Sequence, residues 1–199
     1  MQRSWRNDTD KLTFIICLPS QTTATVTTPE RCSIVAQRDD ASHLMVGDIN
    51  LFLYDDGEAE AEVKSCEGSN GITGCLGKKQ LVGEVELMIA RKEWQGQGLG
   101  RAAVLLFLWY IAAHKEDIVA AHCGSSSAGV LRYLSAKIHE SNVRSIGLFE
   151  SLLFRKKSEA PNYFGEMELV LEDLDSVKLD ELMKRYGLEG GNKLKYEEL

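Results

Sequence analysis

Residues 95–102 are Gln-Gly-Gln-Gly-Leu-Gly-Arg-Ala, a glycine-rich segment between a predicted strand at 80–90 and a predicted helix that begins at Gly98. Glycine lets the backbone turn without a Cβ clash. The first N–H groups of a helix have no intrahelical partner and lie at the positive end of the helix dipole. The segment is therefore typical of a phosphate or pyrophosphate site, although a glycine cluster alone also fits a helix entry without a ligand.

Three phosphate-binding patterns can be compared with this segment. A Walker loop needs Lys-Ser/Thr after its last glycine, and Arg101-Ala102 stand there instead. The dinucleotide pattern matches formally at 98–103, but it expects glycines directly after the first strand and an acidic residue about 20 positions later at the end of a second strand. The third pattern, Gln/Arg-x-x-Gly-x-Gly/Ala, is complete in Gln95, Gly98 and Gly100.

Apolar periodicity extends the prediction to the rest of the chain. The expected strands are 11–18, 45–54, 80–90, 131–138, 154–157 and 165–171. The expected helices are 98–114, then 142–153 with Asn142 as N-cap and Ile146, Phe149 and Leu153 on its apolar stripe, and a tail helix with Leu179, Leu182, Met183 and Tyr186 that ends at Gly187. Hairpin-connected strands followed by a βαβ crossover predict a mixed α/β (α+β) fold.

Two of the strands show a clear alternation of side-chain character. In 45–54 the apolar face is expected to hold Gly47, Ile49, Leu51 and Leu53, and the other face Val46, Asp48, Asn50 and Phe52. In 80–90 one face holds Glu84, Glu86 and Met88, and the other Val85, Leu87 and Ile89. The segment 21–42 is expected to be a surface loop, 55–79 an insertion between paired strands, and 116–130 a flexible insertion.

Composition excludes several classes of protein. The chain has 199 residues, 44% of them hydrophobic, and a net charge of −7, so one ordinary domain is expected and a nucleic-acid partner is not. The tail from Glu166 holds −5 of that charge, with ten acids and five bases. The longest apolar run, 102–113, is too short to span a membrane. No signal-peptide core follows Met1, which favours the cytoplasm. The five cysteines contain no CxxC pair, so no metal site is expected.

Two motifs follow one another along the chain. The first is Gln95-x-x-Gly98-x-Gly100, and the second runs from Asn142-Val-Arg-Ser145 to Phe149-Glu150 and Phe154. With both motifs in register, the sequence resembles the GCN5-related N-acetyltransferase superfamily. The resemblance implies a mixed, mostly antiparallel twisted sheet flanked by helices, with a central pair of splayed strands, and acetyl-CoA as cosubstrate. It covers the chain from Met1 to about residue 171, which suggests an acetyltransferase domain at 1–172 and an acidic tail at 173–199.

Further blocks resemble one branch of the superfamily, the N-acetyltransferase 9 proteins. These blocks are Ser4-Trp5, Asp10-Lys11-x-Thr13-Phe14-Ile15, 46–53 and 83–90. The resemblance implies acetylation of protein N-termini, with tubulin subunits as the substrates named for that branch. Members of the superfamily begin with a further strand and helix, so the chain is expected to start inside the second helix of the fold and to be incomplete at its N-terminus.

The resemblance also assigns roles to residues. Cosubstrate binding falls to Leu87, Met88 and Ile89 through their backbone, to Gln97, Gly98, Leu99 and Gly100 at the pyrophosphate, and to Gln95, Arg101 and Asn142 nearby. Glu86 is the first choice as general base and Glu84 the second. Phe149 stands where many members have a proton-donating Tyr, so Ser145 or solvent would serve the leaving thiolate.

Each assignment has a simpler structural interpretation. Both glutamates could line a solvated sheet face, Asn142 could only cap its helix, and Phe149 could be core. Two other functions also stay open. One is a CoA-binding or interaction module without catalysis, and the other is a dinucleotide-binding oxidoreductase, which the match at 98–103 alone favours.

Overall fold

The computed structural model describes residues 8–20, 33–57, 79–124, 129–188 and 193–197. Several features of the sequence lie outside these residues. They are the Ser4-Trp5 block, positions 21–32 of the loop predicted at 21–42, positions 58–78 of the insertion predicted at 55–79, and positions 125–128 of the one predicted at 116–130.

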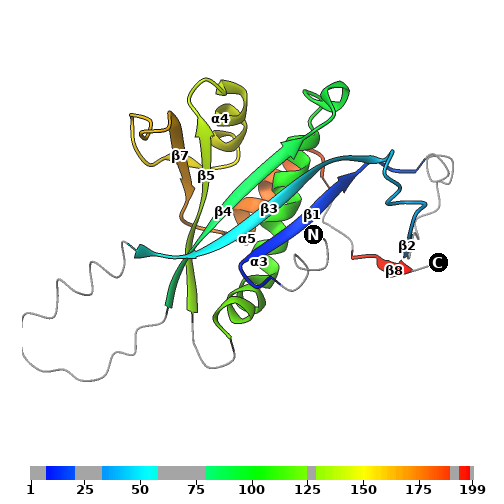
Figure 1. Ribbon diagram of the computed structural model, residues 1–199, viewed down its shortest axis with the longest axis horizontal. Helices are drawn as coiled ribbons and strands as arrows, with labels where there is room; N and C mark the ends of the chain where they lie inside the picture. Colours follow the sequence, from blue (N-terminus) through cyan, green and yellow to red (C-terminus); the bar gives the residue numbers. More distant parts are fainter. Residues whose placement is uncertain (1–7, 21–32, 58–78, 125–128, 189–192, 198–199) are drawn as a thin grey trace, which may run out of the picture. The chain divides into compact units, whose positions relative to one another are not determined.

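Six strands form one hydrogen-bonded sheet in the order β1-β3-β4-β5-β7-β6 (Figure 1). Their bounds are β1 Lys11–Cys17, β3 Met45–Asp55, β4 Lys79–Ile89, β5 Gly129–His139, β6 Arg155–Lys156 and β7 Glu166–Leu171. Strands β4 and β5 pair in parallel, and β7 is antiparallel to both β5 and β6. The prediction of a mixed, mostly antiparallel sheet is confirmed.

The parallel pair contains a register shift. Its ladder runs from Lys79 opposite Gly129 to Glu84 opposite Ser135, with an irregularity between Leu81 and Val82. Parallel strands need a long connection, and helix α3, Leu99–Cys123, provides it.

The chain forms two compact units. The first contains residues 1–12, 51–86 and 111–175, and the second contains 13–50, 87–110 and 176–199. The division into a domain at 1–172 and a tail at 173–199 stays a prediction.

The core of the first unit includes strand and helix residues from its C-terminal half. Leu134 and Leu169 are fully buried, and helix α4, Val143–Glu150, buries Ile146 and Phe149. The prediction for Leu153 was wrong, because its side chain is 40% exposed while that of Leu152 is fully buried. The helix ends before this point, and Leu153 has a φ of 72°, so helical spacing no longer applies.

Strand β3 shows the predicted alternation in part. Ile49, Leu51 and Leu53 are buried as expected, but Val46, which was expected on the polar face, is 1% exposed. The Val46 carbonyl accepts hydrogen bonds from two successive N–H groups, those of Ala90 and Arg91, at 2.8 and 3.3 Å. Two residues that follow β4 thus oppose one residue of β3, which is the pattern of a β-bulge at this end of the pair.

Helix α3 is longer than the sequence predicted. It continues to Cys123 across a kink at His114, where φ is −122°, so the expectation of a flexible insertion was wrong for residues 116–123. Val119 on this second part is buried, which gives the segment an apolar anchor. Alanine and glutamate favour helix, and the segment contains both.

The second unit holds residues 99–110 of α3 and residues 13–17 of β1. The Phe14 ring packs edge-on against those of Phe107 and Tyr110, with centroids 5.5 and 5.0 Å apart. Helix α5, Ser176–Arg185, confirms the predicted tail helix and buries Leu179, Leu182 and Met183.

A parallel pair of three-residue strands was not predicted. Strand β2, Ser33–Val35, lies in a segment expected to be a loop, and it pairs with β8, Lys195–Glu197. Such short strands carry no periodicity of their own and form only through pairing. The Tyr196 hydroxyl donates to Asp40 Oδ2 at 2.7 Å, and this bond tethers β8 to the turn after β2.

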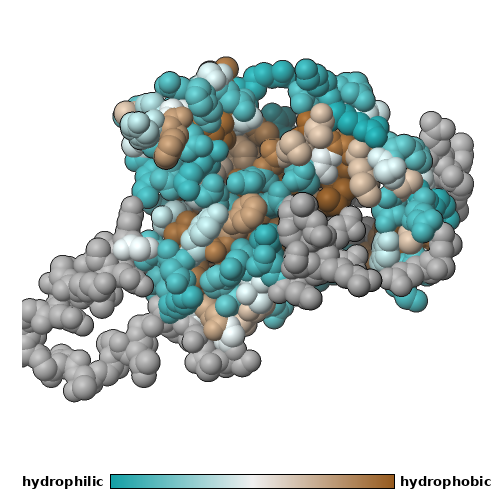
Figure 2. Space-filling view, in the orientation of Figure 1, coloured by the Kyte–Doolittle hydropathy of each residue, from teal (hydrophilic) through white to brown (hydrophobic). Residues whose placement is uncertain are grey.

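The surface mixes polar and apolar side chains. On the face drawn in Figure 2, apolar residues are visible between hydrophilic ones. Ile15 and Met88 are among the exposed large apolar residues, at 53% and 55%. Of the helices described here, none has the length and apolar content to cross a membrane.

Candidate functional site

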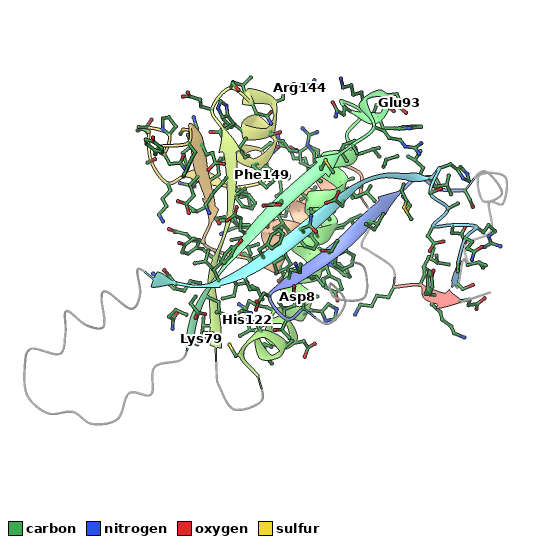
Figure 3. All side chains as sticks on the ribbon, viewed as in Figure 1. Asp8, Lys79, Glu93, His122, Arg144 and Phe149 are labelled. Atoms are coloured by element: carbon green, nitrogen blue, oxygen red, sulfur yellow. The ribbon has the colours of Figure 1, made fainter. Side chains whose placement is uncertain are left out.

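The glycine-rich turn lies in the second unit, between β4 and α3. A short 3-10 helix, η2, Lys92–Trp94, follows β4, and Glu93 on it is labelled in Figure 3. Gly96 and Gly98 then take φ values of 74° and 88°. A Cβ at Gly98 would meet no atom within 4 Å, so the backbone conformation, and not packing, requires glycine there. The turn also leaves open space beside this residue.

Two glutamine side chains hold the turn to its own backbone. Gln95 Nε2 donates to the Ile89 carbonyl at 2.7 Å, which ties the turn to the end of β4. Gln97 Nε2 donates to the Glu93 carbonyl. In the structure both side chains therefore act on the loop, and cosubstrate binding by Gln95 stays a prediction.

The N-terminus of α3 presents unpaired donors and positive charge. The first intrahelical hydrogen bond runs from the Ala102 N–H to the Gly98 carbonyl at 3.0 Å, so the N–H groups of 99–101 have no intrahelical acceptor. The first turn contains no acidic residue, although acids usually favour that position. Arg101 occupies it instead, with its guanidinium 4.4 Å from the ring centroid of Tyr186.

The end of β4 approaches β3 closely. A Cβ on Gly47 would clash with the Met88 carbonyl oxygen, so only glycine allows this contact. Met88 is exposed, whereas Leu87 and Ile89 are half-buried. This is the backbone segment, Leu87–Ile89, to which the resemblance assigned cosubstrate binding.

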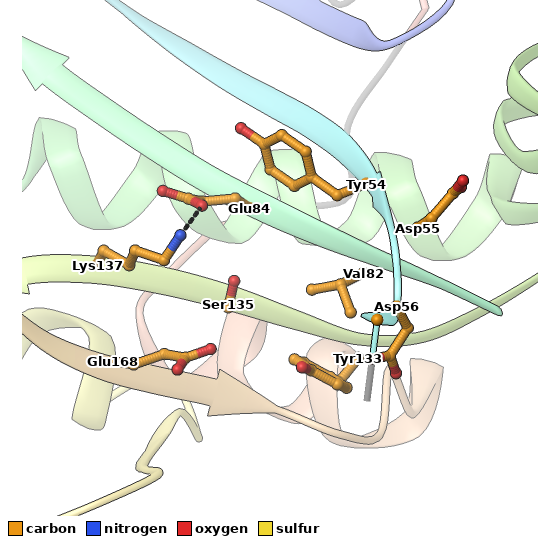
Figure 4. A pocket seen from close by; sticks show the side chains of 10 residues that line it. Tyr54, Asp55, Asp56, Val82, Glu84, Tyr133, Ser135, Lys137 and Glu168 are labelled. Carbon is orange, nitrogen blue, oxygen red and sulfur yellow. Dashed lines mark hydrogen bonds and ion pairs between the residues drawn. The ribbon is translucent and has the colours of Figure 1, made fainter. Parts of the chain in front are cut away.

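The first unit contains an open pocket of about 340 Å³ (Figure 4). It is lined by Tyr54, Asp55, Asp56 and Gly57, by Val82 and Glu84 of β4, by Tyr133, Ser135 and Lys137 of β5, and by Glu168 of β7. Across it the Lys137 ammonium donates to Glu84 Oε2 at 2.7 Å, drawn as a dashed line in Figure 4.

Charges around this pocket are balanced in pairs. Arg132 Nη1 lies 2.6 Å from Asp56 Oδ2, and Lys79 Nζ lies 2.8 Å from Asp55 Oδ1. Because each carboxylate has a cationic neighbour, the pocket does not gather a large uncompensated negative charge.

The two candidate bases differ in environment. Glu84 is 8% exposed, and the hydrogen bond that it accepts raises the pKa of Lys137 above the ordinary lysine value. Glu86, two positions further on the same face, is exposed. Burial first, and then the Glu84 carboxylate, raise the pKa of the Tyr54 hydroxyl, which therefore stays protonated at neutral pH.

Helix α4 shows the structural roles that the sequence offered as simpler alternatives. Asn142 is the N-cap, and its Oδ1 accepts the Ser145 N–H at 3.2 Å. Phe149, labelled in Figure 3, is 4% exposed and packs edge-on against Phe154 with centroids 5.0 Å apart. The Ser145 side chain is half-buried.

Tyr54, Lys137 and Tyr186 are among the residues of these sites that sequence reasoning missed. Alternation within 131–138 places Tyr133, Ser135 and Lys137 on one face, and that signal was available. Pairing Lys137 with Glu84 also required the β4–β5 register, whose irregularity no local pattern reveals. Tyr186 was recognised as an apolar helix position, but its contact with Arg101 depends on tertiary structure.

The described residues contain no group of three or more His, Cys, Asp or Glu side chains that could hold a metal ion. Cys17 and Cys123 are free thiols, and the other three cysteines lie outside the described residues. His122 pairs with Asp10, at 3.1 Å between Nδ1 and Oδ1, and so has a structural partner.

A mostly antiparallel sheet, with one parallel crossover whose helix starts at a glycine-rich turn, defines an α/β protein. The chain is 32% identical over 176 residues to an N-acetyltransferase 9-like protein of Schizosaccharomyces pombe, covering 86% of this chain and 74% of that protein. It is 32% identical to one from Caenorhabditis briggsae, covering 88% and 66%. It therefore belongs to the N-acetyltransferase 9-like family, and the predicted resemblance is confirmed.

A human relative also carries an N-acetyltransferase 9 name. The human alpha/beta-tubulin-N-acetyltransferase 9 is 31% identical over 172 residues, which cover 86% of this chain and 60% of the human protein. The chain thus spans only part of the length of these relatives, from 60% to 74% in the three compared here. No family model matches the sequence.

Solved structures with a similar arrangement were also found. They include Arabidopsis thaliana NAA60 in complex with acetyl-CoA, at 13% identity and a TM-score of 0.42, covering 68% of this chain and 70% of that one. A spermidine N-acetyltransferase chimera from Vibrio cholerae and hSSAT has 13% identity and a TM-score of 0.47, covering 89% of this chain and 74% of that one. At these scores the similarity supports no further conclusion.

Proposed function

We propose that this chain is an acetyl-CoA-dependent N-acetyltransferase that transfers the acetyl group to a protein amine. One observation carries the proposal. A glycine-dependent turn, with φ of 88° at Gly98, opens helix α3, the first α-helix after β4, in a chain that belongs to the N-acetyltransferase 9-like family.

The residues of this turn fit a diphosphate. The N-terminal turn of α3 holds no acid, Arg101 supplies a cation whose buried Nε has no hydrogen-bond partner among the described residues, and the space at Gly98 is open. In the proposal the backbone N–H groups of 97–100 and the Arg101 guanidinium hold the diphosphate, because helix N-termini and arginine both bind phosphate.

The backbone of Leu87–Ile89 is proposed to hold the pantetheine arm and to polarise the thioester carbonyl, as donors of an oxyanion site do. The attacking amine nitrogen forms a bond to the carbonyl carbon, and the carbon–sulfur bond then breaks. One amine proton passes to a base, and the thiolate leaves and takes up a proton. Acetylated amine and CoA are the products.

Glu86 is the proposed general base. The Glu84 carboxylate is held by Lys137 at 2.7 Å, and proton uptake there would break a part-buried ion pair. Glu86 is exposed on the same face of β4, where water can connect it to a bound amine.

Protonation of the leaving thiolate has no donor at Phe149, which is buried and lacks an ionisable proton. The Ser145 hydroxyl or solvent is proposed for this role. Asn142 already uses its Oδ1 to cap α4, so its contribution to cosubstrate binding is proposed as secondary.

For the acceptor, we propose the α-amine of a protein N-terminus, tubulin included. The support is that relatives of human and Drosophila melanogaster, both 31% identical, are named alpha/beta-tubulin N-acetyltransferases. The cytoplasmic location expected from the sequence stays a prediction.

The competing functions separate in binding and turnover experiments. A dinucleotide enzyme fits poorly, because its fingerprint belongs to a mostly parallel doubly wound sheet and this sheet is mostly antiparallel. In calorimetry we expect acetyl-CoA and CoA to bind and NAD and NADP not to. Binding of NAD without CoA would refute the proposal.

Turnover tests the base. Mass spectrometry of N-terminal tubulin-like peptides should show acetylation by the native chain, and Glu86→Gln should lower kcat by about 100-fold or more with little change in acetyl-CoA affinity. Glu140→Gln, at another exposed glutamate, is the matched control and should keep full activity. A chain that binds acetyl-CoA but acetylates no peptide would instead be the non-catalytic binding module.

A further inference from the structure

The guanidinium of Arg101 lies over the ring of Tyr186, 4.4 Å from its centroid. Arg101 belongs to the first turn of α3, and Tyr186 directly follows the last residue of α5. Both residues belong to the second unit. The residue that follows the tail helix therefore contacts a residue of the proposed diphosphate site.

Arg101 differs in charge pairing from two other arginines of the chain. Arg38 pairs with Asp39 at 2.9 Å, and Arg132 pairs with Asp56 at 2.6 Å. For Arg101 the described part of the chain provides an aromatic ring but no carboxylate within ion-pair distance, and its buried Nε has no hydrogen-bond partner.

An aromatic face and a carboxylate hold an arginine in different ways. A carboxylate takes up N–H donors of the guanidinium and neutralises its charge. A ring attracts the cation through its π face and leaves the donors at the guanidinium edge available. The ring thus orients Arg101 and leaves its N–H donors available to a phosphate.

The position of Tyr186 is itself well fixed. Helix α5 is anchored by Leu179, Leu182 and Met183, all buried. The Tyr186 N–H bonds to the Leu182 carbonyl at 3.0 Å, and the Leu188 N–H bonds to the Met183 carbonyl at 2.8 Å. Because the chain is held on both sides of Tyr186, the ring has little freedom to leave Arg101.

We propose that Tyr186 is a positioning residue of the cosubstrate site. It holds the Arg101 side chain so that the guanidinium donors face the diphosphate of CoA at the N-terminus of α3. The inference rests on the proposed function and extends it, because it makes the end of α5 part of the site. Tyr186 acts through Arg101 and does not itself touch the reacting atoms.

Three variants test this by calorimetry, with CoA, 3′-dephospho-CoA and pantetheine as probes. Tyr186→Leu removes the ring and should weaken CoA binding by about 5- to 30-fold. Tyr186→Phe keeps the ring and should stay within about twofold of the native chain. Arg101→Gln should weaken CoA binding by about tenfold or more, and after that change Tyr186→Leu should have little further effect.

The probes separate positioning from a general structural effect. Dephospho-CoA, which keeps the diphosphate, should lose as much affinity as CoA in Tyr186→Leu, and pantetheine, which lacks the diphosphate, should lose none. Equal losses for all three probes, or additive effects of the two substitutions, would overturn the inference. So would native CoA affinity in Tyr186→Leu. Tyr163→Leu, at a residue 97% exposed in the other unit, is the matched control.

Failure of the inference and failure of the proposed function give different results. A native chain that binds no CoA refutes the proposed function. A native chain that binds CoA, with Tyr186→Leu unchanged, refutes only the role of Tyr186. Thermal unfolding of each variant checks folding, and Tyr186→Phe and Arg101→Gln keep the test decisive if Tyr186→Leu is unstable.

Discussion

The ion pair between Glu84 and Lys137 shows how one contact changes the role of a side chain. From the strand pattern alone, Glu84 and Glu86 are equivalent carboxylates on one face. The structure places the Lys137 ammonium 2.7 Å from Glu84 and leaves Glu86 exposed. Since the Glu84 side chain is only 11% exposed, removal of its partner would leave a buried anion.

We therefore expect Lys137→Met to lower the free energy of unfolding by about 1–3 kcal/mol. The loss is limited because the lysine side chain is 43% exposed and water weakens the ion pair. Urea denaturation measures the change. Lys92→Met, at an exposed lysine of η2, should change stability little. Equal stability of the two variants would contradict a structural role for the pair.

The same pair gives a pH dependence with a defined sign. The hydrogen bond to Glu84 raises the pKa of Lys137 in the folded chain, so its contribution is fully present below the ordinary lysine value of 10.5 and is lost as pH rises through the higher folded value. The stability gap between the native chain and Lys137→Met should be constant near neutrality and narrow above pH 10.5. A gap that widens in that range would contradict this sign.

The positive φ of Gly98 predicts what a side chain at this position would do to stability. Gly98→Ala should cost about 1–2 kcal/mol of stability, because φ is 88° and left-handed backbone is unfavourable for alanine. Gly147→Ala is the matched control: it lies within helix α4 and a Cβ there also meets nothing within 4 Å. It should raise stability by about 0.5–1 kcal/mol. Thermal unfolding compares the two, and the same sign for both would contradict the account.

At the scale of elements, helix α4 depends on its N-cap. Asn142→Ala should lower stability by about 1 kcal/mol, whereas Asn142→Asp should keep the cap and lose little. Acetyl-CoA affinity, measured in the same samples, separates capping from cosubstrate binding. If Asn142→Asp is stable but binds acetyl-CoA much more weakly, the amide group has a role in binding beyond its cap.

The pKa of Asp40 reports on the contact between β8 and the turn after β2. The hydrogen bond from Tyr196 lowers the pKa of Asp40 below its ordinary value of 3.8, so this contact stabilises the fold above that pH and is lost as pH falls through the lower folded value. Tyr196→Phe should raise the pKa of Asp40 toward 3.8, measured by NMR titration. An unchanged pKa would mean that the contact is absent in solution.

The elements that could be predicted are those whose sequence signals lie within the segment itself. Strand β4, helix α5 and the capping of α4 by Asn142 were predicted, because apolar spacing and cap chemistry lie within each segment. Strands β2 and β8 were not, since three residues carry no period. The extension of α3 to Cys123 was missed because the kink at His114 interrupts its pattern.

For the whole molecule, the same distinction applies to the site. The glycine turn at 95–101 was predicted from residue types, and its backbone conformation agrees with that prediction. The partners of Glu84 and Arg101 could not be predicted, because Lys137 and Tyr186 meet them only through sheet register and helix packing. The charge environment of Glu84 and of Arg101 therefore depends on tertiary contacts and not on neighbouring residues in the sequence.

The reaction proposed for the chain is acetyl transfer to a protein amine. The most direct measurement is tandem mass spectrometry of an N-terminal tubulin peptide incubated with the chain and isotopically labelled acetyl-CoA. We expect one labelled acetyl group on the α-amine, formed by the native chain and nearly lost in Glu86→Gln. Absence of any labelled product on this and other N-terminal peptides, from a chain that calorimetry shows to bind acetyl-CoA, would contradict it.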